Sequence, residues 1–471
     1  MNGRQSVKKI ILLTATLNSF LTPFMGSSVN VALPSIAAEM NMDALSMSMI
    51  TTLYLLATAV CMVPAGKFAD LHGRKKVFQA GSFIYLLASL VCSMASSPFM
   101  LFAGRILQGI GSAMVMSTGM AIISSVFPQG ERGRALGINS ASVYAGLTLG
   151  PFLGGWLTQT TGWRSIFLIH LPVGLTILVL LFLFLKNEEW NEQEKSHKTD
   201  ISGTLLYGLF LIFIMSGFST LPQWKGYVMI TAGIIFFFLF FSNELRHPSP
   251  IIDMSLFREN KVFTFSSLAA LINYSATHAI VFLLSLYLQY IKQFSPRQTG
   301  MIILTQPLMM AIISPFAGAL ADRINANKLS SAGMAVSAAG LFLFTFFNDQ
   351  TSTGLIISNL ILVGIGFGLF ISPNTAAVMA SVEKKHYGVA SSLLGTMRLL
   401  GQMFSLGIAM MIIAVFLGKV KIQPSGHAAL LKSMHVSFIV FALLSVAGIF
   451  AALIRNRHAG NNDAAGTSAT P

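Results

Sequence analysis

Residues 66–76 read GKFADLHGRKK, and residues 318–328 read GALADRINANK. Both stretches contain the pattern Gly-x-φ-Ala-Asp, in which φ is an apolar residue, and both lie in a polar segment between two long apolar stretches. Asp70 and Asp322 therefore occupy equivalent positions, although the second copy lacks the Gly-Arg-Lys ending of the first. Such a repeat predicts a chain built from two related halves.

The amino-acid composition excludes an ordinary soluble protein. Of the 471 residues, 54% are hydrophobic and only 10% are charged, whereas a soluble domain carries about 25% charged residues. The mean hydropathy is +0.71, so most of the surface must face lipid. At roughly 20 apolar residues for each spanning helix, the chain has room for about a dozen or more. The two cysteines, Cys61 and Cys92, lie inside apolar stretches, which predicts core residues rather than a disulfide or a metal site.

Fourteen apolar stretches, separated by polar segments, predict an all-α polytopic membrane protein. The predicted membrane helices cover residues 10–32, 45–65, 77–95, 100–122, 135–157, 166–185, 201–218, 228–242, 262–290, 299–320, 329–346, 354–372, 389–417 and 433–454. The repeat groups them into an N-terminal six-helix bundle (1–186), a cytoplasmic linker with two inserted helices (187–260), a C-terminal six-helix bundle (261–457) and a disordered tail (458–471).

The distribution of basic residues predicts the orientation in the membrane. The net charge is +14, and if the helices alternate in direction, 21 of the 30 Lys and Arg residues fall on one side of the membrane, 7 on the other and 2 within helices. Because basic segments stay in the cytoplasm, we expect a multi-pass protein of a bacterial inner or plasma membrane with both termini cytoplasmic. The same distribution explains the charge without a nucleic-acid partner. The first apolar stretch lacks a clear cleavage site, so we expect it to be a retained helix.

The polar segment 66–76 resembles the loop motif of the major facilitator superfamily, G-x-L-A-D-R-x-G-R-K. The matching positions are Gly66, Asp70, Gly73, Arg74 and Lys75. The resemblance implies a fold of two six-helix bundles and a gating role for this loop and for Asp322 in the second copy. Small residues permit a tight turn, and a carboxylate can accept hydrogen bonds from helix N-terminal amides. A loop that is basic only because it faces the cytoplasm would explain the two basic residues but not the placed Asp and glycines.

The fourth apolar stretch contains Arg105-x-x-Gln108-Gly109-x-Gly111. An arginine inside an apolar helix is energetically expensive and is therefore a candidate functional residue. The pattern resembles the fourth-helix motif of the same superfamily, and this resemblance implies a role for Arg105 in proton coupling. The alternative is that Arg105 lies near the outer end of its helix and extends to the membrane interface.

The fifth apolar stretch contains Gly146-x-x-x-Gly150-Pro151-x-x-Gly154-Gly155. Glycines on neighbouring faces allow another helix to approach closely, and the proline bends its own helix. The pattern resembles the antiporter motif found in exporters of the superfamily, and this implies export rather than import. A general glycine-rich packing face is the alternative, which accounts for the glycines but not for the whole pattern.

Three further stretches, with the fourteen spans, resemble the QacA/EmrB-like drug:proton antiporters. They are NVALP at 30–34, WRSIF at 163–167, and the segment 388–401 that contains Arg398. That branch usually has an acidic residue at the position of Met25, which would face the substrate cavity. None of the 16 Asp and Glu residues falls inside a predicted helix core. This departure argues against an organic cation as the substrate, because a buried cation needs a carboxylate or an aromatic cage.

Proton coupling requires a group that titrates near neutral pH, and histidine is the usual one. His278 lies inside an apolar stretch beside Asn273, Tyr274 and Thr277, which predicts a face that lines the cavity. Its alternative is a histidine held by structural hydrogen bonds, and that interpretation is stronger still for His170. A buried Arg398 without an acidic partner would face backbone carbonyls, water or an anionic substrate.

These features predict a proton-coupled exporter of amphipathic small molecules that works by alternating access and is not an enzyme. An exporter or flippase of lipid-linked or anionic compounds, anchored by Arg105 and Arg398, is the alternative. An importer or a membrane sensor is less well supported. The sequence contains no Walker A pattern and no hydrolase or zinc-protease pattern. We expect no cofactor and no metal, the proton gradient as energy source, and a monomer in the lipid bilayer.

Overall fold

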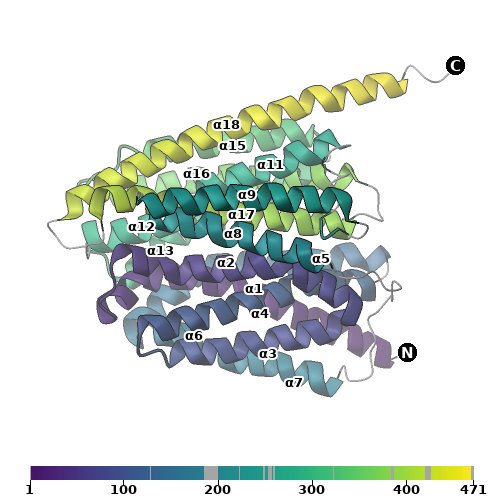
Figure 1. The fold of residues 1–471 in the computed structure, drawn as a ribbon, viewed down its shortest axis with the longest axis horizontal. Coiled ribbons are helices and arrows are strands. Elements are labelled where there is room, and N and C mark those ends of the chain that lie inside the picture. The colour runs from purple at the N-terminus through teal and green to yellow at the C-terminus, as the bar shows by residue number, and fades with distance from the viewer. Residues whose placement is uncertain are drawn as a thin grey trace. The chain divides into compact units, whose positions relative to one another are not determined.

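The computed structural model describes residues 2–127, 129–184, 200–221, 223–247, 250–252, 257, 260–321, 323–382, 387–418 and 426–467. The regular elements in these ranges are helices, as the sequence predicts (Figure 1). Their bounds are α1 (Asn2–Glu39), α2 (Ala44–His72), α3 (Arg74–Ser93), α4 (Pro98–Val126), α5 (Gln129–Thr160), α6 (Arg164–Leu168), α7 (His170–Phe184), α8 (Ile201–Thr220), α9 (Trp224–Arg246), α11 (Lys261–Thr277), α12 (Ala279–Leu286), the π-helical turn η1 (Tyr287–Ile291), α13 (Pro296–Ile303), α14 (Thr305–Ala321), α15 (Ala326–Phe344), α16 (Thr353–Ala380), α17 (Tyr387–Leu417) and α18 (His427–Thr467).

The chain divides into two compact units. Unit 1 contains Met1–Ile251, Val281–Leu304 and Ile413–His427, and unit 2 contains Ile252–Ile280, Thr305–Ile412 and Ala428–Pro471. The first border between the two units lies between Ile251 and Ile252. The segment with the inserted helices is predicted to end nearby, at residue 260. The predicted four-part division of the chain and its disordered tail stay predictions, and α18 ends inside that tail at Thr467.

Each of the fourteen predicted membrane stretches corresponds to one or more helices, but the count of fourteen spans is not exact. Twelve helices of the described chain are long and apolar enough to cross a membrane. The two predicted stretches outside this set fall on α5 and α15. Both helices carry polar residues in their first turns, with Glu131 in α5 and Asn327 and Lys328 in α15.

Three predicted helices are interrupted, and a nearby proline accounts for two of the interruptions. The stretch 166–185 divides into α6 and α7 at Ile169, and the stretch 299–320 divides into α13 and α14 at Leu304. In both cases a proline follows three residues later, Pro172 or Pro307, and removes a helical hydrogen bond. The stretch 262–290 divides at His278, where no proline follows.

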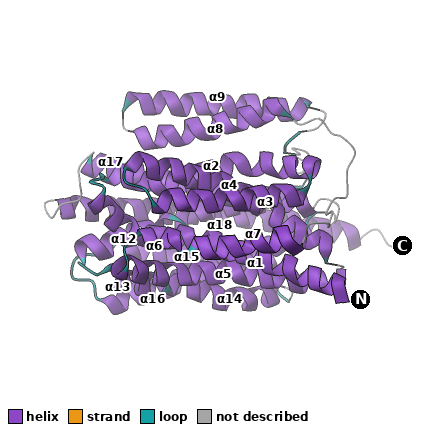
Figure 2. Ribbon diagram, turned by 90° about the horizontal axis from the view of Figure 1, so that it is seen from below, coloured by secondary structure: helices purple, strands orange, loops and turns teal. Residues whose placement is uncertain are grey.

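Unit 1 has its core between the N-terminal helices. Helix α1 packs along α5, and α4 packs against both α2 and α3. An apolar cluster joins side chains of α1, α3, α4 and α7, namely Ile11, Leu21, Phe78, Val115, Ile122, Ile177 and Leu181. Helices α8 and α9 lie side by side (Figure 2), and α8 packs against α2. These contacts bring the loop motif at the end of α2 near the inserted helices.

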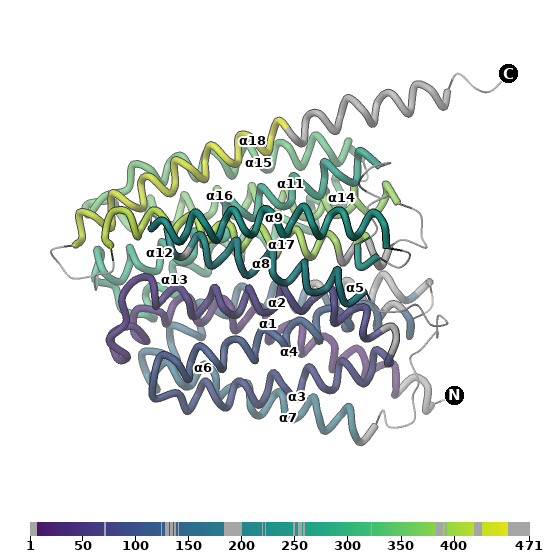
Figure 3. The backbone as a smooth tube through the Cα atoms, viewed as in Figure 1, coloured from purple at the N-terminus to yellow at the C-terminus, as the bar shows by residue number. Residues whose placement is uncertain are grey.

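Unit 2 is centred on α16, which packs against α14, α15 and α11. The ring of Phe344 on α15 stacks on that of Phe438 on α18, with centroids 4.8 Å apart. The path of the chain through these helices can be followed in Figure 3. Asn374 on α16 donates from Nδ2 to the carbonyl of Ser266 on α11 at 3.2 Å, which fixes these two helices beside each other.

Candidate functional site

The predicted loop motif forms the junction between α2 and α3. Gly73 is the residue between the two helices, with φ of +105°, and its N–H donates to the carbonyl of Ala69 at 2.8 Å. Only glycine adopts this backbone conformation readily, which explains the second glycine of the motif. A Cβ at Gly66 would lie 3.6 Å from Cβ of Ser117 on α4, an ordinary contact. The tight turn expected here is therefore present at Gly73.

The roles of the charged residues in this motif stay predictions. Asp70 lies in the last turns of α2, and its side chain is outside the described part of the structure. The equivalent Asp322 also lies outside the described residues. Arg74 and Lys75 begin α3, and both have interacting partners in the structure.

Arg105 on α4 is fully buried inside unit 1. Its Nε donates to the carbonyl of Ile50 on α2 at 2.9 Å, and its Nη1 donates to Oε1 of Gln108 at 2.6 Å. The guanidinium carbon lies 4.3 Å from the ring centroid of Tyr54. Gln108 in turn donates to Oγ of Ser89 at 2.8 Å. The alternative that Arg105 extends to the membrane interface is therefore wrong.

His170 is buried in the same unit, in the field of the Arg105 charge. Its Nδ1 lies 3.2 Å from the carbonyl of Ile166, and its Nε2 lies 3.3 Å from the carbonyl of Leu21. Both ring nitrogens thus face backbone acceptors, which fits the structural interpretation of this histidine. We call Arg105, its partners Tyr54 and Gln108, and His170 the Arg105 layer.

The glycines of α5 bring that helix into close contact with α1. A Cβ at Gly146 would meet the carbonyl of Phe20, and one at Gly150 would meet Oγ of Ser27. Ser28 donates from Oγ to the carbonyl of Gly150 at 2.8 Å, and Gly154 lies against the backbone of Ser28. Any larger side chain at these positions would push the two helices apart.

The same motif also contacts α13 on another face of α5. A Cβ at Gly155 would meet the carbonyl of Pro296, and a Cβ at Gly300 would meet the carbonyl of Pro151. Close packing on two sides accounts for the glycines of the motif. The link between this motif and export stays a prediction.

Unit 2 contains a second group of buried polar side chains, on α11 and α17. The guanidinium carbon of Arg398 lies 5.4 Å from the ring centroid of Tyr274, and the buried Nε of Arg398 has no hydrogen-bond partner among the described residues. Within the described part of the chain, both polar side-chain atoms of the fully buried Asn273 also lack a partner, as does Nε2 of His278. We call Asn273, Tyr274, His278 and Arg398 the Arg398 layer.

A side chain of α17 interrupts the long helix at His278. The N–H of Ala279, the first residue of α12, donates to Oγ of Ser405 on α17 at 2.9 Å. A Cβ at Gly401 would meet the carbonyl of Leu271 and Cβ of Tyr274, so α11 and α17 are closely packed here. The break places His278 at the end of α11 with its Nε2 free of the structural hydrogen bonds that the alternative interpretation requires.

Met25, at the position where an acid was expected, is fully buried on α1. Glu39 and Glu244 lie in the last turns of α1 and α9. Glu39 accepts hydrogen bonds from Arg164 at 2.6 Å and from Trp163 at 2.7 Å. This pairing means that Glu39 is not a free carboxylate for a bound cation.

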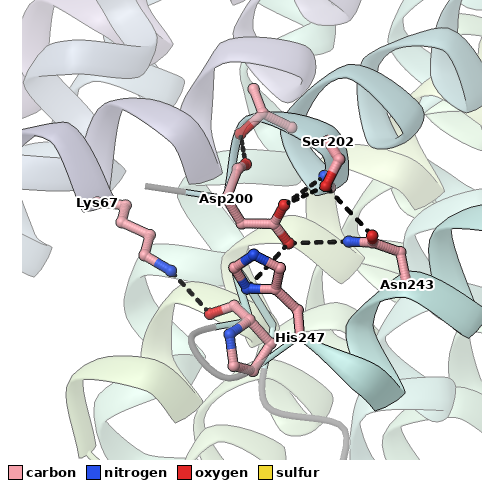
Figure 4. Close-up of polar contacts among 8 residues, drawn as sticks. Lys67, Asp200, Ser202, Asn243 and His247 are labelled. Atoms are coloured by element: carbon pink, nitrogen blue, oxygen red, sulfur yellow. Dashed lines mark hydrogen bonds and ion pairs between the residues drawn. The ribbon is translucent and has the colours of Figure 1, made fainter. Parts of the chain in front are cut away.

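A polar cluster that none of the sequence motifs indicates lies at the ends of α2, α8 and α9 (Figure 4). Asp200 caps α8 and is buried; its Oδ1 accepts from the Gly203 N–H at 2.7 Å. Its Oδ2 accepts from Nδ2 of Asn243 at 2.9 Å and lies 3.7 Å from Nδ1 of His247. Burial acts to raise the pKa of Asp200, but the Gly203 amide and the neighbouring polar groups outweigh it, so the pKa lies below its usual value. Asp200 is therefore ionised at neutral pH.

A signal for Asp200 exists in the sequence. An aspartate directly before an apolar helix is a typical N-cap, and here Ile201 begins such a helix. Lys67, in the stretch 66–76, also belongs to this cluster. The sequence does not indicate its role, because its partners come from a segment far along the chain.

The sequence model of the Major Facilitator Superfamily matches residues 15–272 and 266–470. The chain belongs to the Major Facilitator Superfamily. A similar protein is the riboflavin transporter RibZ of Clostridioides difficile, 33% identical over 402 residues that cover 85% of this chain and 87% of that one. The multidrug resistance protein Stp of Mycobacterium tuberculosis is 31% identical over 87% of this chain and 76% of its own. The superfamily expected from the motifs is thus confirmed, and the chain is a multi-span membrane transporter.

A bacterial homologue of the human lysosomal transporter Spinster, solved in an inward-facing and unoccupied conformation, has the same fold. The two chains align with a TM-score of 0.69 and 16% identity, over 97% of each. The predicted fold class, an all-helical transporter fold of this superfamily, is therefore correct. The fourteen-span branch of drug antiporters stays a prediction.

Proposed function

We propose that this transporter is a proton-coupled exporter of amphipathic small molecules that works by alternating access. The observation that carries the proposal is α5, whose Gly-x-x-x-Gly-Pro-x-x-Gly-Gly pattern resembles the antiporter motif and packs tightly against α1 and α13. Two relatives with multidrug names support the proposed class of substrate, namely the multidrug resistance protein Stp and the multidrug transporter protein MdtP of Bacillus subtilis, which is 28% identical over 92% of this chain.

In this proposal the Arg398 layer binds the substrate. Buried polar atoms without partners cost free energy, and a ligand that supplies their hydrogen bonds recovers that cost. Arg398 and Asn273 hold polar groups of the substrate, and the ring of Tyr274 covers its apolar part. Met25 lies on the path of the substrate and leaves it without a carboxylate.

Proton coupling is assigned to His278 and Arg105. His278 is the group that takes up and releases the proton, because its Nε2 is free of protein partners and histidine ordinarily titrates near neutral pH. Arg105 fixes α4 against α2 through the Ile50 carbonyl. The loop motif, with Asp70 and Asp322, stabilises one of the two states of the cycle, and a substrate shifts that equilibrium only by binding one state better.

A second candidate function, export or flipping of lipid-linked or anionic compounds, is favoured by Arg398. The described residues form no ion pair with this side chain, and its Nε has no hydrogen-bond partner. An anionic group of a substrate would supply both an ion pair and a hydrogen-bond acceptor for Arg398. The riboflavin transporter relative indicates that polar aromatic compounds also fall within this family.

The direct test is transport into everted membrane vesicles, with one cationic, one neutral and one anionic fluorescent compound. We expect accumulation of the neutral or anionic compound when the vesicle interior is acidified, and its loss when an uncoupler is added. Gly150→Ala should stop this transport, whereas Gly26→Ala should not, because a Cβ at Gly26 meets no atom within 4 Å. Accumulation that persists with the uncoupler, or occurs only in the opposite direction, would overturn the proposal.

A further inference from the structure

The inserted helices α8 and α9 attach to α2 at two places. In the middle of α8, the Tyr207 hydroxyl donates to the carbonyl of Ala59 at 3.2 Å, and a Cβ at Gly208 would lie 3.4 Å from Val60. The second place is the cluster at the helix ends around Asp200 and Lys67 (Figure 4). Many apolar side chains of α9 are exposed, so the attachment to α2 depends on these few contacts of α8 and the cluster.

The cluster holds two buried carboxylates close together. A Cβ at Gly203 would meet the carboxylates of both Asp200 and Glu244, which shows that the two acids approach the same point beside this glycine. Both are almost fully buried. Two buried like charges repel each other strongly unless cations compensate them.

Lys67 supplies a compensating charge from α2. The charges of Asp200 and Glu244 both act on its ammonium group, which also donates to the carbonyl of Pro250 at 3.0 Å. His247 lies on the other side of Asp200, with Nδ1 3.7 Å from Oδ2. The cation of α2 thus belongs to the same cluster as the acids of α8 and α9.

We propose that Asp200 and Lys67 act as positioning residues, forming an electrostatic latch that fastens the inserted helix pair to the end of α2 that carries the loop motif. Lys67 lies three residues before Asp70 and six before the turn at Gly73. Any movement of the loop motif between transport states must therefore carry α8 and α9 along or break the latch. The kinetic consequence rests on the transport function proposed above, whereas the latch itself does not.

A purely structural role for Asp200 as the N-cap of α8 makes a different prediction. Asparagine caps helices about as well as aspartate, so Asp200→Asn keeps the bond to the Gly203 amide and removes only the charge. Lys67→Gln likewise keeps a donor for the Pro250 carbonyl. Asp43→Asn is the matched control, because Asp43 caps α2 through the Ser46 amide at 2.8 Å and is not part of the cluster.

The experiment measures the distance between nitroxide labels at Phe68 and Leu205, both exposed, in a background with Cys61 and Cys92 replaced by alanine. We expect a narrow distribution in the parent protein, a broad one in Asp200→Asn and in Lys67→Gln, and no further broadening in the double variant. Asp43→Asn should stay narrow. A narrow distribution in Asp200→Asn, or broadening that adds in the double variant, would overturn the latch.

Transport kinetics form the second arm. If the latch couples the inserted helices to the gate, turnover should fall about fivefold in either single variant and no further in the double variant, with KM unchanged, since coupled residues show non-additive effects. Equal loss in Asp43→Asn, or a change in KM alone, would contradict this role. Absence of transport in the parent protein would overturn the proposed function, and the label distances would still decide the latch.

Discussion

The Arg105 layer of unit 1 and the Arg398 layer of unit 2 contain the same kinds of side chain but differ in how they are satisfied. Arg105 lies 4.3 Å from the ring of Tyr54 and donates hydrogen bonds from Nε and Nη1. Arg398 lies 5.4 Å from the ring of Tyr274, and its Nε donates no hydrogen bond to any described residue. His170 faces two backbone carbonyls, whereas Nε2 of His278 has no partner in the described ranges.

The difference separates a layer that stabilises the fold from a layer that is available to a ligand. A satisfied polar network rigidifies a core, whereas unsatisfied buried groups cost stability and are retained at functional sites. The Arg105 layer is not perfectly satisfied, since Nη2 of Arg105 and the hydroxyl of Tyr85 lack partners. Its hydrogen bonds nevertheless join α2, α3 and α4.

The largest expected effect is a loss of stability on removing Arg105. Arg105→Ala leaves the Ile50 carbonyl and the Gln108 side chain buried without their donor, and should destabilise the protein by about 2–4 kcal/mol. Arg398→Ala should cost less than about 1 kcal/mol, because it breaks no described hydrogen bond. Thermal melts of both purified variants in detergent measure the contrast. Equal losses of Tm in the two variants would show that the Arg398 layer stabilises the fold as much as the Arg105 layer does.

The next prediction concerns the two buried amides. Asn273→Leu should leave the melting temperature unchanged or raise it, because replacing an unpartnered buried polar group with an apolar one removes a desolvation cost. The same variant should lose most of its transport. Gln108→Leu should lower the melting temperature, since Gln108 links Arg105 to Ser89. A marked loss of stability in Asn273→Leu would show that Asn273 is a structural residue.

A third prediction compares the two histidines through the pH dependence of transport. His278→Gln should abolish proton-driven transport and leave substrate exchange without a pH gradient in place, because glutamine cannot carry the proton. His170→Gln should keep the pH profile of the parent protein, even if expression falls. If the pH profile changed in His170→Gln and stayed normal in His278→Gln, His170 would be the proton-carrying residue and His278 the structural one.

The smallest expected effect is that of the tyrosine hydroxyls. Tyr54→Phe removes the bond between the Tyr54 hydroxyl and Oγ of Ser112, 3.0 Å apart, and should cost about 1 kcal/mol in stability. Tyr274→Phe keeps the aromatic face that Arg398 approaches and should change transport of an apolar substrate less than twofold. Tyr274→Ala is the informative partner variant, because it removes the ring as well.

Much of the fold follows from the sequence, because membrane helices are apolar over their whole length. The interruptions before Pro172 and Pro307 are also visible in the sequence, since proline removes a helical donor. The break at His278 is not, because its cause is Ser405, which lies 126 residues beyond Ala279 along the chain. Two of the predicted stretches lie on helices that are not apolar enough to be counted as spans: α15 begins with the polar Asn327 and Lys328, and α5 carries glycines and polar residues along its length.

The candidate site was predictable in its residue types but not in its contacts. Arg105 stands out as a charge in an apolar stretch, yet its burial depends on a carbonyl of another helix. The unpartnered state of Asn273 and Arg398 depends in the same way on what surrounds them. Asp200 was missed because the sequence assigns it to a linker, although an aspartate before an apolar helix predicts a cap.

The most direct test of the account is the substrate preference of the protein in proteoliposomes with an imposed pH gradient. A neutral, an anionic and a dicationic compound are compared at equal concentration in the parent protein, in Arg398→Gln and in Met25→Asp. We predict that the parent protein transports the anion and the neutral compound, that Arg398→Gln loses the anion about tenfold while keeping the neutral compound, and that Met25→Asp gains the dication. Strong transport of the dication alone by the parent protein, unchanged in Arg398→Gln, would contradict the assignment of the Arg398 layer to substrate binding.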